Sequence, residues 1–448
     1  MQQRKNSIDM VNGPLASRIF LFALPLMASM LIQQLFNTAD TIVVGRFAGP
    51  QALAAVGSCG YLVGLFVNFF MGFSMGTNVI LSRSFGANDM EAVRKGVHTS
   101  VSFSALCGVL LGILGFFFAP DLLTLTRVPD DIIDMAVLYV RIYFLGSPAC
   151  LVYNFGAAIL RSQGDTKRPL YFLTAAGILN VGLNLIFVIC FHMTTDGVAL
   201  ATILSQYLSA FLVIRCLTQE SGPLHLDLRQ LALDRHVISG IVRLGLPNGL
   251  ESALYSISNM TVQSAINSFG SNVVAGSAAA SSLHALVMIP SNSVNQAVLT
   301  FSGQNHGAQR YDRVDRVFLL GLLFSGMLGL VAGNLFYLFG TQLLTIYVGE
   351  NAAVIQQGMT HIRCIFPYSM FCATMGATSC TLRGLGYSVI PMVVAILGTC
   401  GLRVVWVAFV LPLFNTTPVL FAIWPISWTS TTVTLGIIFL FIRKKLHS

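Results

Sequence analysis

Charged residues are scarce in this chain. Of its 448 residues, only 9% are Asp, Glu, Lys or Arg and 55% are hydrophobic, whereas soluble domains carry about 25% charged residues. This composition excludes an ordinary soluble domain, and it indicates that lipid is the solvent for most of the chain.

Motifs of catalysis and metal binding are also missing. The nine cysteines include no Cys-x-x-Cys pair, the eight histidines are scattered, and no phosphate-binding glycine loop, zinc motif or nucleophile elbow is found. The sequence thus predicts neither an enzyme nor a resident cofactor. The N-terminal residues lack the apolar core and cleavage site of a signal peptide, so we expect the first span to act as its own insertion signal.

What the chain has in abundance is long apolar stretches. They run continuously and do not alternate in polarity, which favours membrane-spanning helices over the strands of a barrel. The prediction is an all-α membrane protein with twelve transmembrane helices, at approximately 17–44, 54–82, 95–119, 132–157, 169–191, 197–217, 237–266, 277–303, 316–338, 358–382, 388–411 and 418–442.

Basic residues gather on one side of these spans. Most of the 25 Lys and Arg residues lie near the two ends of the chain and in loops on the same side, while Arg141, Arg363 and Arg403 fall inside spans. The positive-inside rule therefore predicts a multi-pass protein of the plasma or inner membrane with both termini cytoplasmic. The net charge of +8 follows this distribution and does not indicate nucleic-acid binding.

The chain repeats itself at an offset of about 222 residues. The matching positions include Pro25 and Pro247, Arg141 and Arg363, and Gly164 and Gly386. We predict two pseudo-symmetric six-helix lobes, at 1–217 and 237–448, joined by a cytoplasmic linker at 218–236. Six spans per lobe is an even number, so the repeat is parallel, as in many transporters that alternate access between the two sides. The protein is expected to function as a monomer.

Asp40 is the only ionisable residue between Ile19 and Val44, a run long enough to cross a bilayer. Acids within a membrane are costly and by default mark ion or proton sites. Three polar residues are predicted at a similar depth on the fifth and sixth spans: Asn180, Asn184 and Thr202. All four residues are specific to the N-terminal half, because apolar side chains stand at the matching positions of the second half.

These four residues leave two coupling ions open. Their carboxylate, amide and hydroxyl oxygens suit a hard cation, so they form a metal-ion site only if Na⁺ is the coupling ion. The carboxylate could instead bind a proton, because burial disfavours its charged form. For the amides and the hydroxyl, interhelical hydrogen bonding is the structural alternative.

A second polar stripe begins at Glu251 in the seventh span. Tyr255 and Asn259 follow on the same helical face, and Gln33 and Asn37 share the face of the first-span acid. We predict that these five residues contact the substrate. Glu251 would bind a cationic group or serve as a second proton site, and a structural hydrogen bond to a neighbouring helix is the alternative.

Several segments resemble the multidrug and toxic compound extrusion (MATE) transporters. The run FALPLMASMLIQQLFNTADTIVVGRFAGPQALAAVG from Phe22 is similar to their first-helix signature, and so are LRSQGDTKRP at 160–169 and its partner at 382–391. The resemblance covers essentially the whole chain. It implies export of organic cations and other amphipathic toxins, driven by inward movement of Na⁺ or H⁺.

The resemblance also assigns residues. Asp40 matches the family's coupling acid, and Glu251 matches a seventh-helix acid of some branches. The residues matching the companions of the coupling acid are Asn180, Asn184 and Thr202. Many members have an acid where this chain has Asn184, and the tenth-helix acid of one branch has no counterpart in 364–382. The coupling ion is therefore not implied.

We accordingly predict a secondary antiporter for small cationic or amphipathic compounds, driven by H⁺ or Na⁺. The alternative is a flippase for a lipid-linked saccharide, in a related superfamily. That activity would favour a large basic cavity formed by Arg141, Arg363 and Arg403. A channel is disfavoured, because two different halves supply no ring of repeated filter loops.

Overall fold

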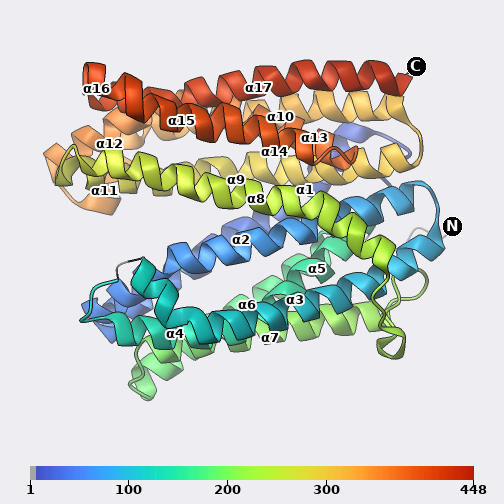
Figure 1. The fold of residues 1–448 in the computed structure, drawn as a ribbon, viewed down its shortest axis with the longest axis horizontal. Coiled ribbons are helices and arrows are strands. Elements are labelled where there is room, and N and C mark those ends of the chain that lie inside the picture. Colours follow the sequence, from blue (N-terminus) through green and yellow to red (C-terminus); the bar gives the residue numbers. More distant parts are fainter. Residues whose placement is uncertain (1–6, 127, 448) are drawn as a thin grey trace. The chain divides into compact units, whose positions relative to one another are not determined.

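The protein is built from helices, and the computed structural model describes residues 7–126 and 128–447 without any strand among them (Figure 1). The first half comprises α1 (Leu15–Val43), η1 (Val44–Ala48), α2 (Pro50–Gly86), α3 (Met90–Leu125), α4 (Ile133–Leu145), α5 (Ser147–Gln163), α6 (Lys167–Leu185), η2 (Ile186–Cys190), α7 (Thr195–Gln219) and η3 (Leu228–Gln230). The second half comprises α8 (Arg235–Asn267), α9 (Ser271–Gly307), α10 (Tyr311–Leu338), α11 (Gly340–Val348), α12 (Ala352–Ile365), η4 (Phe366–Tyr368), α13 (Ser369–Gly384), α14 (Val389–Ala395), η5 (Ile396–Gly401), α15 (Leu402–Val405), η6 (Trp406–Val410), α16 (Leu411–Phe414) and α17 (Thr417–His447).

Each of the twelve predicted spans falls on one or more of these helices, which confirms the all-α fold class. In the described part of the chain, nine helices are long and apolar enough to cross a membrane, or ten if the bent pair α4 and α5 is one span. The predicted spans 237–266 and 358–382 lie outside that set, on α8 and on α12 to α13. Polar residues such as Glu251 and Asn259 lower the hydropathy of α8, while α12 and α13 have only 14 and 16 residues and are separated by η4.

The duplication is visible in the backbone as well as in the sequence. Residues with positive φ recur at nearly the same offset: Gly49 (95°) and Gly270 (96°), Asn88 (56°) and Gln309 (55°), and Gly164 (104°) and Gly386 (86°). Positive φ is costly for residues other than glycine. The two halves therefore end and restart their helices with the same local geometry.

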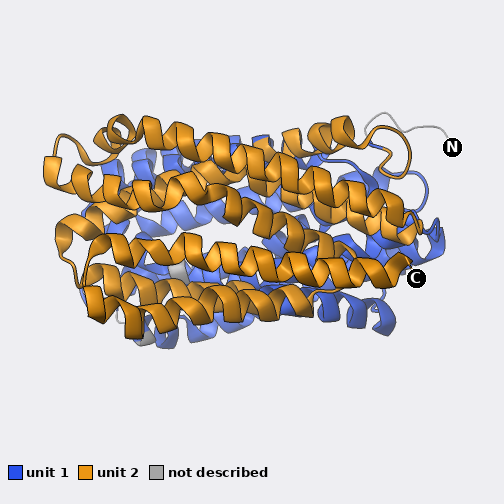
Figure 2. Cartoon of the chain, turned by 90° about the horizontal axis from the view of Figure 1, so that it is seen from above, with its two compact units in different colours: residues 1–8, 28–249 blue, residues 9–27, 250–448 orange. Residues whose placement is uncertain are grey.

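The described chain forms two compact units by its internal contacts (Figure 2). One consists of residues 1–8 and 28–249, the other of residues 9–27 and 250–448. The boundaries fall inside α1 and α8, two to three residues after Pro25 and Pro247. Each of these two helices thus begins in one unit and ends in the other.

The segment predicted as a linker is packed into the first unit. Leu224 and Leu226 are fully buried in a cluster with apolar residues of α2, α3, α5 and α7. The backbone N–H of Asp227 donates to Nε2 of His98 at 3.0 Å. This segment is consequently an ordered part of the first unit.

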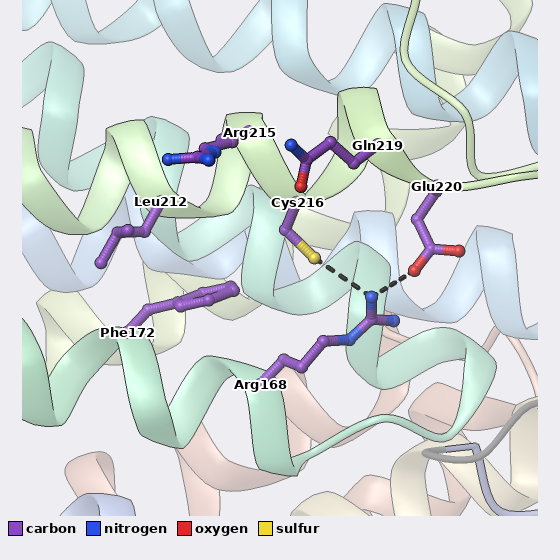
Figure 3. Close-up of a pocket in the computed structure, with 7 residues that line it drawn as sticks. All are labelled: Arg168, Phe172, Leu212, Arg215, Cys216, Gln219 and Glu220. Carbon is purple, nitrogen blue, oxygen red and sulfur yellow. Dashed lines mark hydrogen bonds and ion pairs between the residues drawn. The ribbon is translucent and has the colours of Figure 1, made fainter.

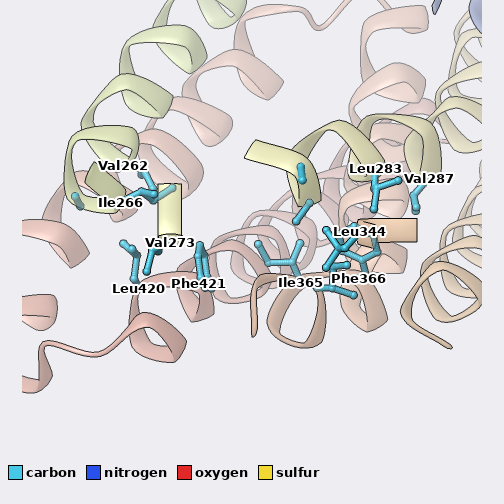
Figure 4. Close-up of a cluster of buried hydrophobic side chains, with 14 of the residues drawn as sticks. Val262, Ile266, Val273, Leu283, Val287, Leu344, Ile365, Phe366, Leu420 and Phe421 are labelled. Atoms are coloured by element: carbon cyan, nitrogen blue, oxygen red, sulfur yellow. The ribbon is translucent and has the colours of Figure 1, made fainter. Parts of the chain in front are cut away.

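The second unit has an extensive apolar core, part of which is drawn in Figure 4. Val262 and Ile266 of α8 contribute to it, together with Ile365 of α12 and Phe421 of α17. Val262 stands at the repeat position of Asp40, and it is 1% exposed. The same place in the fold is therefore polar in one unit and part of an apolar core in the other.

Candidate functional site

Asp40 and Asn184 lie near the ends of their helices, each just before a π-helical segment. Asp40 precedes η1 in α1, and Asn184 precedes η2 in α6. Such wide turns are rare and occur frequently at functional sites. Phe36, one turn before Asp40, fits its ring against bare backbone at Gly177, two turns before Asn184. An added Cβ at Gly177 would lie 1.6 Å from Cε2 of Phe36.

The structure brings Asp40, Asn180 and Asn184 together. Nδ2 of Asn184 donates to Oδ1 of Asp40 at 2.5 Å. The amide of Asn180, turned so that its nitrogen faces the carboxylate, donates to Oδ1 at 2.8 Å and to Oδ2 at 3.2 Å. The opposite orientation would set the amide oxygen against two carboxylate oxygens, which repel it. Two neutral amides thus hold the carboxylate of Asp40 in place.

One oxygen of this cluster has no hydrogen-bond partner among the described residues. Oδ1 of Asn184 is buried and unpaired, and Asn184 as a whole is 0% exposed. An unpaired buried acceptor is destabilising by about 1–3 kcal/mol. A proton on Asp40 or a small cation beside it would give this oxygen a partner.

Thr202 and the two amides of α1 are not part of this hydrogen-bonded cluster. The hydroxyl of Thr202 donates to the backbone oxygen of Val198 at 2.9 Å, within α7. Gln33 and Asn37 are exposed on α1. Their roles in ion or substrate binding stay predictions.

Glu251 is paired with an arginine. Nη2 of Arg383 donates to Oε2 of Glu251 at 2.6 Å, and the two side chains are only 9% and 14% exposed. The predicted tenth span stops one residue short of Arg383, which lies in the last turn of α13. The carboxylate therefore already has a cationic partner, and its contact with substrate remains a prediction.

Tyr255 and Asn259, predicted one and two turns further along α8, meet a second arginine. Nη1 of Arg403 donates to Oδ1 of Asn259 at 3.0 Å. The Arg403 guanidinium lies 5.9 Å from the ring centroid of Tyr255 and 5.3 Å from that of Trp424. Arg403 was missed as a site residue by sequence reasoning, although its place inside an apolar span was a usable signal.

Two cavities lie away from these clusters. One, of about 480 Å³, lies where α6 begins and α7 ends and is lined by Arg168, Phe172, Leu212, Arg215, Cys216, Gln219 and Glu220 (Figure 3). Arg168 pairs there with Glu220 and donates to Sγ of Cys216 at 3.2 Å. The other, of about 620 Å³, is formed by α11 and α12 and includes Arg363. Neither includes a residue predicted for ion or substrate binding.

No group of three or more His, Cys, Asp or Glu side chains with metal-binding geometry occurs among the described residues. A cation at Asp40 would therefore take its further ligands from neutral oxygens, such as those of amides, hydroxyls, backbone carbonyls or water.

A duplicated helical membrane protein with an intramembrane acid, Asp40, that is replaced by an apolar residue in the second repeat has the architecture of a secondary transporter. The chain belongs to the MatE family, whose model matches residues 25–186 and again residues 247–409. Members of this family are transporters, so the chain is a transporter and not an enzyme.

Similar proteins agree with this assignment. The chain is 29% identical over 398 residues to the probable multidrug resistance protein YoeA of Bacillus subtilis, covering 87% of this chain and 86% of that protein. It is 24% identical to the probable multidrug resistance protein NorM of Thermotoga maritima, covering 87% and 84%. A solved structure of a multidrug resistance MATE family transporter in an outward-facing conformation superposes with a TM-score of 0.88 at 24% identity, covering 100% of this chain and 99% of that one. At that identity the likeness shows the fold.

Proposed function

We propose that this protein is a secondary active antiporter that exports amphipathic drugs, including organic cations, in exchange for H⁺ or Na⁺. The observation that carries the proposal is the cluster of Asp40, Asn180 and Asn184. In it, a carboxylate of the membrane-spanning helix α1 accepts hydrogen bonds from two buried amides of α6. The names of the multidrug resistance relatives support the substrate class.

Coupling follows from the way the amides are used. An ionised Asp40 accepts from both amide nitrogens, whereas a protonated Asp40 gains an O–H that needs an acceptor. Rotation of the Asn184 amide would offer its unpaired oxygen to that proton. The ion therefore changes the hydrogen bonds between α1 and α6, and a ligand that binds two states unequally shifts the balance between them.

Of the two ions, the proton fits these contacts better. Nitrogens, not oxygens, face the carboxylate, and the hydroxyl of Thr202 is bonded within its own helix. Na⁺ binding would require both amides to turn and oxygen ligands to converge.

The test is efflux of a cationic dye from vesicles under separately imposed H⁺ and Na⁺ gradients. We expect the H⁺ gradient to drive efflux in the wild type and Asp40→Asn to abolish it while the protein still inserts. Asp121→Asn, which removes an exposed carboxylate at the end of α3, is the matched control and should transport normally. Gradient-driven efflux by Asp40→Asn would refute the role of Asp40.

The flippase alternative is not favoured by the comparisons. Its three arginines also have different surroundings among the described residues. Nε of Arg141 donates to the backbone oxygen of Phe116 at 3.2 Å. Arg363 is exposed on α12, and only Arg403 is buried without an acidic partner among the described residues.

We also propose that the protein resides in the plasma or inner membrane as a monomer with both termini cytoplasmic. The bias of basic residues supports this orientation. Fluorescent or phosphatase reporters fused after the C-terminus test it, since each is active on only one side of the membrane.

A further inference from the structure

Arg403 occupies an unusual position in the second unit. It lies in α15, a single helical turn with a π segment on either side, η5 before it and η6 after it. The residue is 3% exposed. Two wide turns around one buried charged residue mark a place where the helix departs from regular geometry, as helices frequently do at functional sites.

The guanidinium of Arg403 lacks an anionic partner. Its one hydrogen bond to a described residue goes to a neutral amide oxygen, that of Asn259, and its Nε is buried with no partner there. Within the described ranges no carboxylate lies at ion-pair distance from it, and the acid of α8, Glu251, is paired with Arg383. The rings of Tyr255 and Trp424 stabilise the positive charge only in part.

Such a charge is costly to bury. Arginine does not lose its proton in proteins, so burial cannot neutralise it. A buried charge without a counter-charge is strongly destabilising. Residues of this kind inside membranes are as a rule functional.

We propose that Arg403 binds an anionic oxygen group, such as a carboxylate, carried by an amphipathic transport substrate. Asn259 is an exposed residue, so a ligand can displace its amide from Arg403. A carboxylate in place of the amide oxygen would accept charge-assisted hydrogen bonds from the planar, forked guanidinium of Arg403. Such hydrogen bonds are about twice as strong as those between neutral groups. Tyr255 and Trp424 supply aromatic surface beside the anion for the apolar body of the same molecule.

The comparison between the repeats points the same way. With the offset of 222 residues, Asn259 matches Asn37, but Trp424 matches Thr202 and Val262 matches Asp40. The first unit therefore places a carboxylate among the repeated helices, and the second places a guanidinium there. These opposite charges are consistent with different ligands for the two units. The first unit would bind the coupling cation, and the second would bind an anionic part of the substrate.

The inference rests on the proposed transport function but can fail separately from it. The probes are a rhodamine with a free carboxylate and its ethyl ester, which share one chromophore and differ in the anion. Their binding to the purified protein in nanodiscs is followed by fluorescence polarisation without any ion gradient. Arg403→Gln removes the charge, Arg403→Lys keeps the charge but not the fork, and Arg363→Gln removes an exposed arginine as the matched control.

We expect Arg403→Gln to weaken binding of the free acid at least about tenfold, which is about 1.4 kcal/mol, and to leave the ester unchanged. Arg403→Lys should weaken binding of the acid to a smaller extent and leave binding of the ester unchanged. This variant tests the proposal if Arg403→Gln does not fold. Equal losses for acid and ester, or no loss for either, would overturn the proposal.

Asp40→Asn separates the two proposals. It should abolish gradient-driven efflux yet keep the preference for the acid over the ester that the proposal requires of the wild type in nanodiscs. Suppose that no gradient drives efflux by the wild type, but that Arg403→Gln weakens binding of the acid and not of the ester. The antiport proposal then fails, while the proposed anion site is supported.

Discussion

Nδ2 of Asn184 lies 2.5 Å from Oδ1 of Asp40, although 144 residues separate the two in the sequence. This contact joins the two helices of the first unit that end in π segments, η1 and η2. An amide in this position can donate to an ionised carboxylate or, after rotation, accept from a protonated one. Protonation of Asp40 would therefore change the orientation of the Asn184 amide, and with it the hydrogen bond between α1 and α6.

The first prediction follows from this pair. Asn184→Asp would place two carboxylates in hydrogen-bond contact, and two such groups cannot both ionise. We expect the half-maximal pH of dye efflux to rise by about a unit or more, measured in vesicles over a range of external pH. Asn184→Leu, which adds no charge, should instead reduce efflux at every pH, and an unchanged pH profile for Asn184→Asp would contradict the pairing.

The ion pair of the second unit gives a double-mutant test. Glu251→Leu or Arg383→Leu alone removes one partner of a buried pair and should destabilise the protein by about 3–5 kcal/mol. The double variant should recover most of that stability, as judged by thermal unfolding in detergent. Normal dye efflux by the double variant would show that Glu251 serves structure rather than substrate binding, whereas a stable but inactive double variant would support the predicted substrate contact.

The close approach of α2 and the first part of α8 depends on glycine. A Cβ at Gly72 would lie 2.5 Å from the backbone nitrogen of Gly249 and 2.7 Å from the backbone oxygen of Gly245. Gly72→Ala should therefore destabilise the protein by about 1–3 kcal/mol. Gly60 lies on the same helix with nothing within 4 Å of its Cβ position. Gly60→Ala should be neutral or slightly stabilising in thermal unfolding, and equal effects of the two changes would argue against this packing.

The segment between α7 and α8 is expected to resist proteolysis because it is anchored by buried leucines. Leu226→Ala should destabilise the first unit by about 2–4 kcal/mol and speed cleavage between residues 221 and 234 in limited proteolysis. Leu231, 44% exposed in the same segment, provides the control. Cleavage of Leu231→Ala at the wild-type rate, with faster cleavage of Leu226→Ala, is the expected pattern. Equal rates in both variants would mean that Leu226 does not hold the segment.

Much of the site could be predicted because depth in a membrane follows from counting. Helical rise is constant, so residue numbers along two spans give comparable depths. Counting placed Asn180 and Asn184 level with Asp40, and the structure joins these three residues. Counting does not give the direction of a side chain, because each residue turns the helix by about 100°. Thr202 has a comparable depth, yet its hydroxyl bonds to Val198 in its own helix.

The lipid solvent, the helical fold and the duplication follow from the amino-acid sequence alone, because each depends on composition or on spacing along the chain. The sequence also shows Asp40 to be the exceptional charge of the first span. The partners of the buried charged groups, in contrast, are visible only in the folded protein. Arg383 reaches Glu251 and Arg403 reaches Asn259 across 132 and 144 residues, and such partners depend on how helices distant in sequence are rotated and shifted against one another. That arrangement is set by packing of the whole unit, and it left Arg403 facing a neutral amide instead of an acid.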